Sequence, residues 1–294
     1  MRRLFLLWMT ASLLGTFRPA AGQEIVYFSP ENILRFADAL FQEKDYGRAA
    51  AEYRRYLMTG DMPSTTAASI YFKIGLCYRL AQDYPKSISV FQTIIEKHSQ
   101  SEAAEDSFYQ VAYNHFLWGR YEDSLSLVDS FLPRIGPPEK KLKLLQLKGM
   151  NFLYQKKWQQ ADAYLRILSE TAVPDPLTAT MKTFAEQGQR LPHKSPFLAG
   201  VLSGLIPGMG KIYAGRTSDG LFSLFTIALT GWQAYEGFHK DGIRSMKGWI
   251  YGSLGAFFYV GNIYGSIAAV RIFNEQSENQ LLQRIGMTVN VYFQ

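Results

Sequence analysis

Residues 71–91 read YFKIGLCYRLAQDYPKSISVF, and this stretch decides the fold. A polar break at residues 81–83 separates two segments that are rich in apolar side chains. Gly75 stands nine positions before Tyr84, and Phe91 stands seven positions after it. A small residue lets two helix backbones approach closely, and a bulky one fills the seam between them. The stretch therefore predicts two helices that are joined by a short turn.

The same pattern recurs four times, at a period of 37–38 residues. Its aromatic position is occupied by Tyr46, Tyr84, Tyr121 and Trp158. Small residues stand nine positions earlier, at Ala37, Gly75, Ala112 and Gly149, and three positions later, at Ala49, Ser87, Ser124 and Ala161. Bulky residues stand seven positions later, at Tyr53, Phe91, Val128 and Leu165. Four coincident columns predict an all-α fold built from repeated helical pairs.

Spacing and residue types together resemble the tetratricopeptide repeat family over about residues 29–174. The resemblance is best in the second repeat, at Tyr71, Ile74, Gly75, Tyr78, Asp83, Tyr84, Ser87 and Phe91. The chain departs from the family in its longer period and in the missing proline that usually closes each repeat. The resemblance implies a helical solenoid of about four repeats, whose first helices line a concave groove.

By the geometry of that family, the predicted partner groove is apolar and aromatic. Its positions are Phe41, Phe72, Arg79, Tyr109, Tyr113, Phe116 and Met150. The groove lacks the Lys/Asn clamp with which some family members hold a peptide carboxylate. We therefore expect a protein or peptide partner with an apolar or amphipathic segment. In the alternative interpretation, these side chains pack against neighbouring helices or against the C-terminal region.

The charge of the chain is distributed like that of a membrane protein rather than that of a nucleic-acid binder. The 294 residues contain 31 Lys and Arg against 25 Asp and Glu, a net charge of +6. Residues 1–22 carry +3, residues 23–193 are neutral, and residues 194–294 carry +3. The excess therefore flanks apolar segments. We expect no nucleic-acid partner.

Residues 1–22 are predicted to be a signal peptide. A basic head at Arg2 and Arg3 precedes an apolar run over residues 4–14, and small residues follow at residues 20–22. We place cleavage after Gly22, with an uncleaved anchor as the alternative. The run of about 11 residues is short for a hydrocarbon core of ~30 Å. Cys77 is the only cysteine, which excludes a lipoprotein anchor and an intrachain disulfide.

The C-terminal third changes abruptly in composition after a linker at residues 175–194. Its uncharged stretches predict a glycine-rich membrane module over residues 195–274, followed by a tail at residues 275–294. Transmembrane helices are predicted at residues 219–238 and 248–271. Residues 195–214, broken at Pro207-Gly208, are predicted to be a short or re-entrant helix, with a full span as the alternative. The tail is predicted to be amphipathic and then strand-like at residues 287–293. The glycines favour close helix packing, within the chain or in a homo-oligomer.

Two motifs mark this module. The first contains Pro207, Gly208, Gly210, Tyr213, Gly215, Asp219 and Gly220, and the second contains Gly261, Asn262, Tyr264 and Gly265. Together they resemble the C-terminal membrane module of an uncharacterised bacterial family, which implies an envelope protein with no assigned reaction. A phosphate-binding loop is not expected, because Leu205 stands where its first glycine belongs and Ile212 replaces its hydroxyl residue. Asn262, in the middle of a span, needs a hydrogen-bond partner.

These features together predict a membrane-anchored periplasmic adaptor, or scaffold, that binds a protein partner. Envelope protein assembly is one process in which such an adaptor would act. We expect it in the bacterial inner membrane, with membrane lipid as a second partner. The alternative is a small transporter or channel component whose membrane module carries the activity. The sequence has no recognisable catalytic or metal-binding motif, so neither an enzyme nor a cofactor is predicted. The predicted orientation depends on the number of spans. With two spans Lys240, Arg244 and Lys247 face the cytoplasm, and with three spans Lys211, Arg216 and Arg271 face it.

Overall fold

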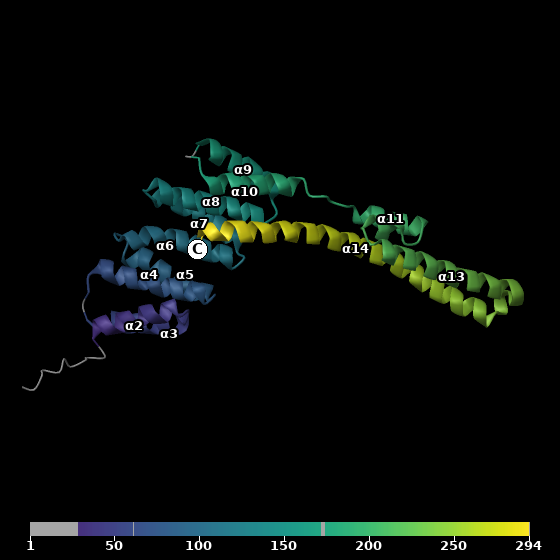
Figure 1. Cartoon of the computed structure of the whole chain (residues 1–294), viewed down its shortest axis with the longest axis horizontal. Helices are drawn as coiled ribbons and strands as arrows, with labels where there is room; N and C mark the ends of the chain where they lie inside the picture. Colours follow the sequence, from purple (N-terminus) through teal and green to yellow (C-terminus); the bar gives the residue numbers. More distant parts are fainter. Residues whose placement is uncertain (1–28, 61, 172–173, 294) are drawn as a thin grey trace, which may run out of the picture. The chain divides into compact units, whose positions relative to one another are not determined.

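The computed structural model of the chain (Figure 1) describes residues 29–60, 62–171 and 174–293. These residues divide into two compact units, with the boundary along the sequence between Trp118 and Gly119. The predicted signal peptide lies outside the described residues. The first unit contains α2 (Pro30–Gln42), α3 (Tyr46–Leu57), α4 (Ser64–Leu80), α5 (Tyr84–Lys97) and α6 (Glu102–Leu117). The second contains α7 (Tyr121–Phe131), α8 (Pro138–Tyr154), α9 (Trp158–Thr171), α10 (Pro176–Gln189), α11 (Pro196–Leu205), α12 (Met209–Tyr213), α13 (Thr217–Asp241) and α14 (Met246–Phe293). Throughout the described ranges the regular elements are helices, which confirms the all-α prediction.

Within each unit, successive helices of the repeat region pack against one another. In the first unit, α2 packs on α3, α3 on α4, α4 on α5 and α5 on α6, and α4 also contacts α6. In the second unit, α7 packs on α8, α8 on α9 and α9 on α10, and α8 also contacts α10. Contact between each helix and the next but one is typical of stacked helical pairs. The repeated arrangement therefore agrees with the predicted repeat fold.

The aromatic column of the sequence marks the start of every second helix. Tyr46, Tyr84, Tyr121 and Trp158 are the first residues of α3, α5, α7 and α9. The small and bulky columns meet in the seams between the paired helices. A Cβ atom on Gly75 would lie 2.6 Å from the Phe91 ring, and one on Gly149 would lie 2.7 Å from the Leu165 side chain. Both glycines are therefore required by the close approach of two helices.

The corner that precedes each second helix has the same backbone conformation in all four repeats. The residue two positions before the aromatic is left-handed: Lys44 has φ 63°, Gln82 62°, Gly119 77° and Lys156 60°. Only one of the four is glycine, the residue that adopts this conformation most easily. In two corners an aspartate then caps the helix, because Asp45 and Asp83 accept hydrogen bonds from the backbone N–H groups three residues later.

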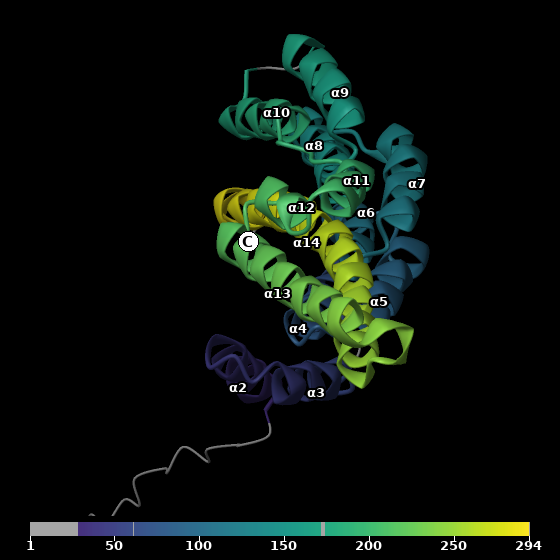
Figure 2. The same ribbon diagram turned by 90° about the vertical axis from the view of Figure 1, so that its right-hand side faces the viewer.

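The C-terminal part of the second unit is a helical hairpin with a short appendage. Helices α13 and α14 lie side by side and are joined by a 3-10 turn at Gly242–Arg244 (Figure 2). Helices α11 and α12 form a broken pair, separated at residues 206–208, and both pack on α14. Gly248 of α14 faces α13, since a Cβ atom there would lie 2.6 Å from the Phe238 ring. Gly248 therefore serves helix packing within the chain.

Helix α14 continues for 48 residues, far beyond the hairpin. The strand-like prediction for residues 287–293 is wrong, because these residues belong to this helix. The reason is the helical spacing of Leu281, Ile285 and Val289, all fully buried on one face. Among the described residues, one helix is long and apolar enough to cross a membrane, and it is this one, over Met246–Val289. The second predicted span, at residues 219–238, lies within α13 and stays a prediction.

Candidate functional site

The predicted groove residues are divided between the two units. Six lie in the first unit, where they pack on near neighbours. Phe41 makes an edge contact with Tyr46, with ring centroids 5.6 Å apart, and Phe72 does the same with Phe91 at 5.2 Å. Both contacts join the two helices of one repeat. Phe41 and Phe72 are also part-exposed, so each helps to hold its repeat together and keeps some of its side-chain surface accessible.

The other four groove residues of the first unit form one continuous set. Tyr113 stacks on Tyr109 at 5.5 Å and on Phe116 at 6.0 Å, and the Arg79 guanidinium lies 5.5 Å from the centre of the Tyr113 ring. Burial raises the pKa of both Tyr109 and Tyr113. Tyr113 and Phe116 are buried. Sequence reasoning thus selected side chains that do lie together, although much of this set is interior.

Met150 of α8, in the second unit, is buried. Its neighbour Gly149 admits the Leu165 and Met181 side chains, which come from α9 and α10. This part of α8 is therefore a packed core with little free surface. The packing interpretation thus holds for Met150, Tyr113 and Phe116, whereas a partner site at the part-exposed members stays a prediction.

In the predicted membrane module, the structure brings most of the motif residues into one joint. Gly208 is left-handed, with φ 88°, and a Cβ atom on it would overlap the Gly220 carbonyl oxygen at the start of α13. A Cβ atom on Gly210 would overlap the Ala199 carbonyl oxygen of α11. A Cβ atom on Gly220 would lie 2.5 Å from Ile212. These three glycines are thus needed where α11, α12 and α13 approach one another backbone to backbone.

A buried hydrogen-bond network fastens this joint to α14. The Asn262 side chain accepts from the Gly208 N–H at 3.2 Å and donates to the Ser203 carbonyl at 3.4 Å. The Ser203 hydroxyl lies 2.7 Å from the Ser266 hydroxyl and accepts from the Gly210 N–H at 2.9 Å. Asn262, Ser203 and Ser266 are all buried. The predicted partner of Asn262 is thus a backbone turn of the same chain, and the two sequence motifs are two halves of one structural contact.

The remaining motif residues lie around the joint or away from it. The Tyr213 hydroxyl accepts from the Ser195 N–H at 3.1 Å, and Asp219 pairs with Arg216 at 2.6 Å. Gly215 is left-handed, with φ 93°. Two residues of the second motif, Gly261 and Tyr264, have no packing role. A Cβ atom on Gly261 would meet nothing within 4 Å, and Tyr264 is 73% exposed. Pro207 and Gly265 lie at the edge of the joint, where the Lys211 stem passes Gly265.

Sequence reasoning missed an amide clamp at the base of the module. The Asn274 side chain accepts from the Lys194 N–H at 2.9 Å and donates to the Lys194 carbonyl at 2.9 Å. The Lys194 ammonium lies 3.8 Å from the centre of the Phe273 ring. Residues 194 and 274 are 80 positions apart and belong to no motif, so only a structure could pair them. The clamp ties the connector between α10 and α11 to the middle of α14.

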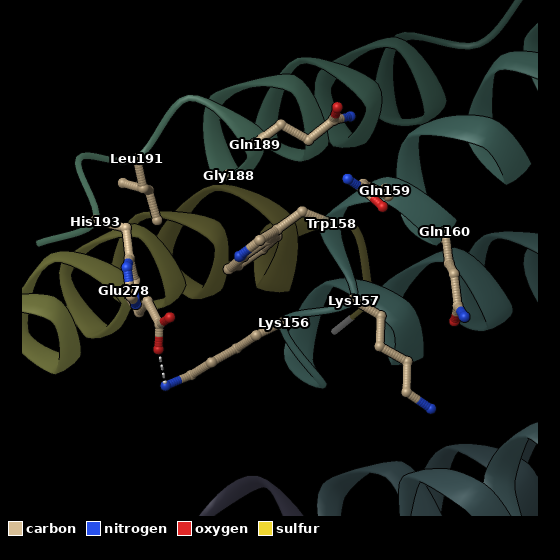
Figure 3. Close-up of a pocket in the computed structure, with 10 residues that line it drawn as sticks. All are labelled: Lys156, Lys157, Trp158, Gln159, Gln160, Gly188, Gln189, Leu191, His193 and Glu278. Carbon is tan, nitrogen blue, oxygen red and sulfur yellow. Dashed lines mark hydrogen bonds and ion pairs between the residues drawn. The ribbon is translucent and has the colours of Figure 1, made fainter. Parts of the chain in front are cut away.

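A second missed contact joins α14 to the repeat helices of the same unit. Lys156, in the corner between α8 and α9, binds Glu278 at 2.7 Å (Figure 3). Beside this ion pair is a surface pocket of about 470 Å³. Trp158 lies against Gly188 of α10 and lines the pocket, together with His193 of the connector. The pocket thus marks the place where α9, α10 and α14 come together.

The hairpin exposes a broad apolar surface. On α13 the exposed side chains are Leu221, Phe222, Phe225, Leu229 and Trp232, and on α14 they are Trp249, Ile250, Phe257, Val260 and Tyr264. Exposed apolar area of this extent is typical of an interaction surface for lipid or protein. The described residues contain no cluster of three or more His, Cys, Asp or Glu side chains that could hold a metal ion.

Residues 70–101 match the family model of the tetratricopeptide repeat. The match covers α5 and most of α4, the repeat in which the sequence resemblance is best. No curated protein that was compared matches the chain. Tetratricopeptide repeats are helical scaffolds for protein–protein interaction. The match thus suggests a scaffold of this kind, and the described residues also contain one helix that is apolar enough to cross a membrane.

Proposed function

We propose that the protein is a membrane-anchored adaptor, whose repeats hold a protein partner close to a bilayer. The observation that carries the proposal is the continuity of α14. One uninterrupted helix of 48 residues forms half of the apolar hairpin and also packs on α10 of the repeat region. A flexible tether would leave the repeats free to move, whereas a shared helix fixes them to the anchor. The architecture thus suits a scaffold that presents a partner at a set place beside the membrane.

The hairpin also favours one orientation. Its turn at Gly242–Arg244 lies at one end, and both routes to the repeats, the connector at Lys194 and α14 at Asn274, leave from the other end. Helix α11 has 10 residues and a length of about 15 Å, too short to span a core of ~30 Å. Two spans therefore place the repeats and the Asn274 clamp on the same side. If the signal peptide exports the repeats, the basic turn faces the cytoplasm, in accord with the positive-inside rule.

Lipid is the second proposed partner. The exposed aromatic and aliphatic side chains of α13 and α14 suit the hydrocarbon region. Cations lie at both ends of this apolar surface: Lys194 lies at the clamp, and Lys240 and Lys247, which both pair with Glu236, lie near the turn. Long basic side chains at such positions reach the headgroups. The predicted bacterial inner membrane is proposed as the location on this basis.

Two experiments in cells test the adaptor. The first is protease protection of full chains that carry a tag either in the turn at residues 242–244 or after residue 293. We expect protease added to spheroplasts to remove the second tag and spare the first. The second places a photo-crosslinking residue at Phe41 or Phe72, with Gln92, exposed on α5, as the matched control. We expect one partner to be captured from both groove positions and not from Gln92. Equal capture from all three sites, or from none, contradicts the proposal.

The transporter alternative has less support from the contacts of the module. Its most polar buried side chain, Asn262, is bonded to Gly208 and Ser203 within the chain. A side chain used in this way holds backbone segments together and is not free to bind a solute. The transporter would regain support if Asn262→Leu abolished a transport activity while the protein still inserted and folded.

A further inference from the structure

The last turns of α14 form an amphipathic segment. Leu281, Ile285 and Val289 are spaced four residues apart and are fully buried. Gln280, Gln283 and Arg284, on the opposite face, are exposed. A helix with one apolar face needs a surface to cover that face. This part of α14 therefore behaves as a docked helix, in contrast to the part that belongs to the hairpin.

The surface that receives this segment is formed in part by α10 and by the corner between α8 and α9. Helix α10 packs alongside α14, and Lys156 of the corner reaches Glu278 at 2.7 Å and Asn279 at 3.5 Å. A shallow depression beside the contact is lined by Leu191 and Pro192 of the connector and by Ser277, Gln280, Gln283, Arg284 and Met287 of α14. Five of these seven residues belong to α14 itself, so the receiving side of the contact consists of α10, Leu191 and Pro192 of the connector, and Lys156.

The polar part of this contact is weak. The Lys156 and Glu278 side chains are each about one-third exposed, at 33% and 31%. Ion pairs of this exposure hold weakly, so the docking depends on three apolar side chains. By contrast, Asn274, four residues before Glu278, holds Lys194 through two hydrogen bonds between its side chain and the Lys194 backbone. The clamp thus holds α14 to the connector just before the docked segment begins.

We propose that this surface binds an amphipathic helix of a protein partner, and that residues 275–289 of α14 occupy it until that partner arrives. The inference rests on the proposed function as a protein-binding scaffold and names the partner's chemistry. The partner helix carries aliphatic side chains at positions i, i+4 and i+8, with an acidic residue three positions before the first. This is the pattern of Glu278, Leu281, Ile285 and Val289. The α14 segment competes at a high effective concentration because it belongs to the same chain.

The test uses the purified full chain in lipid nanodiscs and a fluorescent peptide of residues 275–293 as the probe. Leu281→Asp/Ile285→Asp should release the α14 segment and expose the surface. The matched control is Gln280→Asp/Gln283→Asp, which adds the same charge on the exposed face of the same helix. We expect the first variant to bind the peptide at least tenfold more tightly than the wild type does. The control should behave like the wild type, and a peptide with the two Asp substitutions should not bind.

A second pair of variants keeps the test decisive if the first one misfolds. A Lys156→Glu chain should prefer a Glu278→Lys peptide over the wild-type peptide by threefold or more. The proposal is overturned if a folded Leu281→Asp/Ile285→Asp chain does not bind the peptide, or if Lys156→Glu shows no reversed preference. These assays need neither a cell nor an identified partner. Their failure would leave the crosslinking result at Phe41 and Phe72 standing, so the two proposals fail separately.

Discussion

The Asn262 side-chain carbonyl accepts a hydrogen bond from the Gly208 backbone N–H at 3.2 Å, across 54 residues of sequence. The same side chain donates to the Ser203 carbonyl. One side-chain amide thus bonds two backbone groups at the break between α11 and α12, where the hydrogen-bond pattern of a continuous helix is interrupted. Unpaired backbone groups are costly in an apolar environment, so a broken helix in this module requires a partner such as Asn262.

Replacing Asn262 by leucine should destabilise the hairpin joint. The Gly208 N–H and the Ser203 carbonyl would both lose a partner, at about 1–3 kcal/mol for each buried group left unpaired. Tyr264→Phe, two residues further along α14, is the control, because Tyr264 is exposed. Thermal unfolding in detergent, followed by helical circular dichroism, compares the two variants. If Asn262→Leu unfolds at the wild-type temperature, the amide does not hold the break.

The glycines of the two motifs should respond differently to a methyl group. Gly208→Ala forces a left-handed backbone on a residue with a Cβ atom, at about 1–2 kcal/mol, and adds a clash with the Gly220 carbonyl. Gly261→Ala meets nothing within 4 Å and gains helix propensity, roughly 0.5–1 kcal/mol. We expect poor insertion and low yield for the first variant and a slightly more stable protein for the second. Similar behaviour of the two would contradict the assignment of Gly208 to the joint.

The seam between α4 and α5 offers a double-mutant cycle. A methyl group on Gly75 would lie 2.6 Å from the Phe91 ring, and overpacking of this kind costs about 1–3 kcal/mol. Phe91→Leu removes the obstructing ring, so Gly75→Ala/Phe91→Leu should be more stable than the sum of the single variants predicts. A coupling of at least ~0.5 kcal/mol is expected from urea unfolding. Gly47→Ala, with open space around its Cβ position, is the control, and strict additivity would refute the contact.

At the left-handed corners, two substitutions should change the free energy of unfolding in opposite directions. Gln82→Gly removes a left-handed strain of about 1–2 kcal/mol and adds roughly 0.4–1 kcal/mol of unfolded-chain entropy, so a net gain of about 0.5–1 kcal/mol is expected. Gly119→Ala should destabilise by a similar amount. The control is Gln92→Gly in the middle of α5, which changes the same residue type in a right-handed helix and should lose about 1 kcal/mol. Amide hydrogen exchange measures the stability of the flanking helices in each of the three variants.

Asp38 predicts a local dependence on pH. Burial acts to raise the pKa of this carboxyl, but hydrogen bonds from Lys73 at 2.6 Å and Tyr53 at 2.5 Å lower it below its ordinary value of 3.8. A depressed pKa gives stability that is present above pH 3.8 and is lost as the pH falls through the folded value. The effect should not exceed about 1 kcal/mol, because the ion pair is largely exposed. Hydrogen exchange in α2 and α4 should therefore rise below pH 4 in the wild type more than in Asp38→Asn.

The repeat columns were predictable from the sequence because each is set by local sterics. Gly75 and Phe91 are only 16 positions apart, and one helix crossing decides both residue types. The same reasoning failed at residues 287–293, where β-branched and aromatic residues favoured a strand. There the burial of Leu281, Ile285 and Val289 on one helical face overrides local propensity.

The contacts that couple the parts of the second unit could not be predicted. Asn274 and Lys194 are 80 positions apart, and Lys156 and Glu278 are 122 apart. Neither pair stands in a motif, and a surface lysine or glutamate has no sequence signature that selects its partner. By contrast, Asn262 was predicted to need a hydrogen-bond partner, since an amide in an apolar segment is costly. The identity of that partner, the Gly208 turn, came from the structure.

Residues 246–293 contain no proline, and at about 1.5 Å per residue α14 is roughly 72 Å long. Its two ends lie in different surroundings, one within the apolar hairpin and the other against α10. A bilayer whose thickness does not match the hairpin forces a membrane helix to tilt. Because α14 is clamped at Asn274 and docked at Lys156, such a tilt becomes a torque on the helices that bind it. If α14 spans a bilayer as proposed, the repeat helices that pack on it would respond mechanically to the thickness of that bilayer.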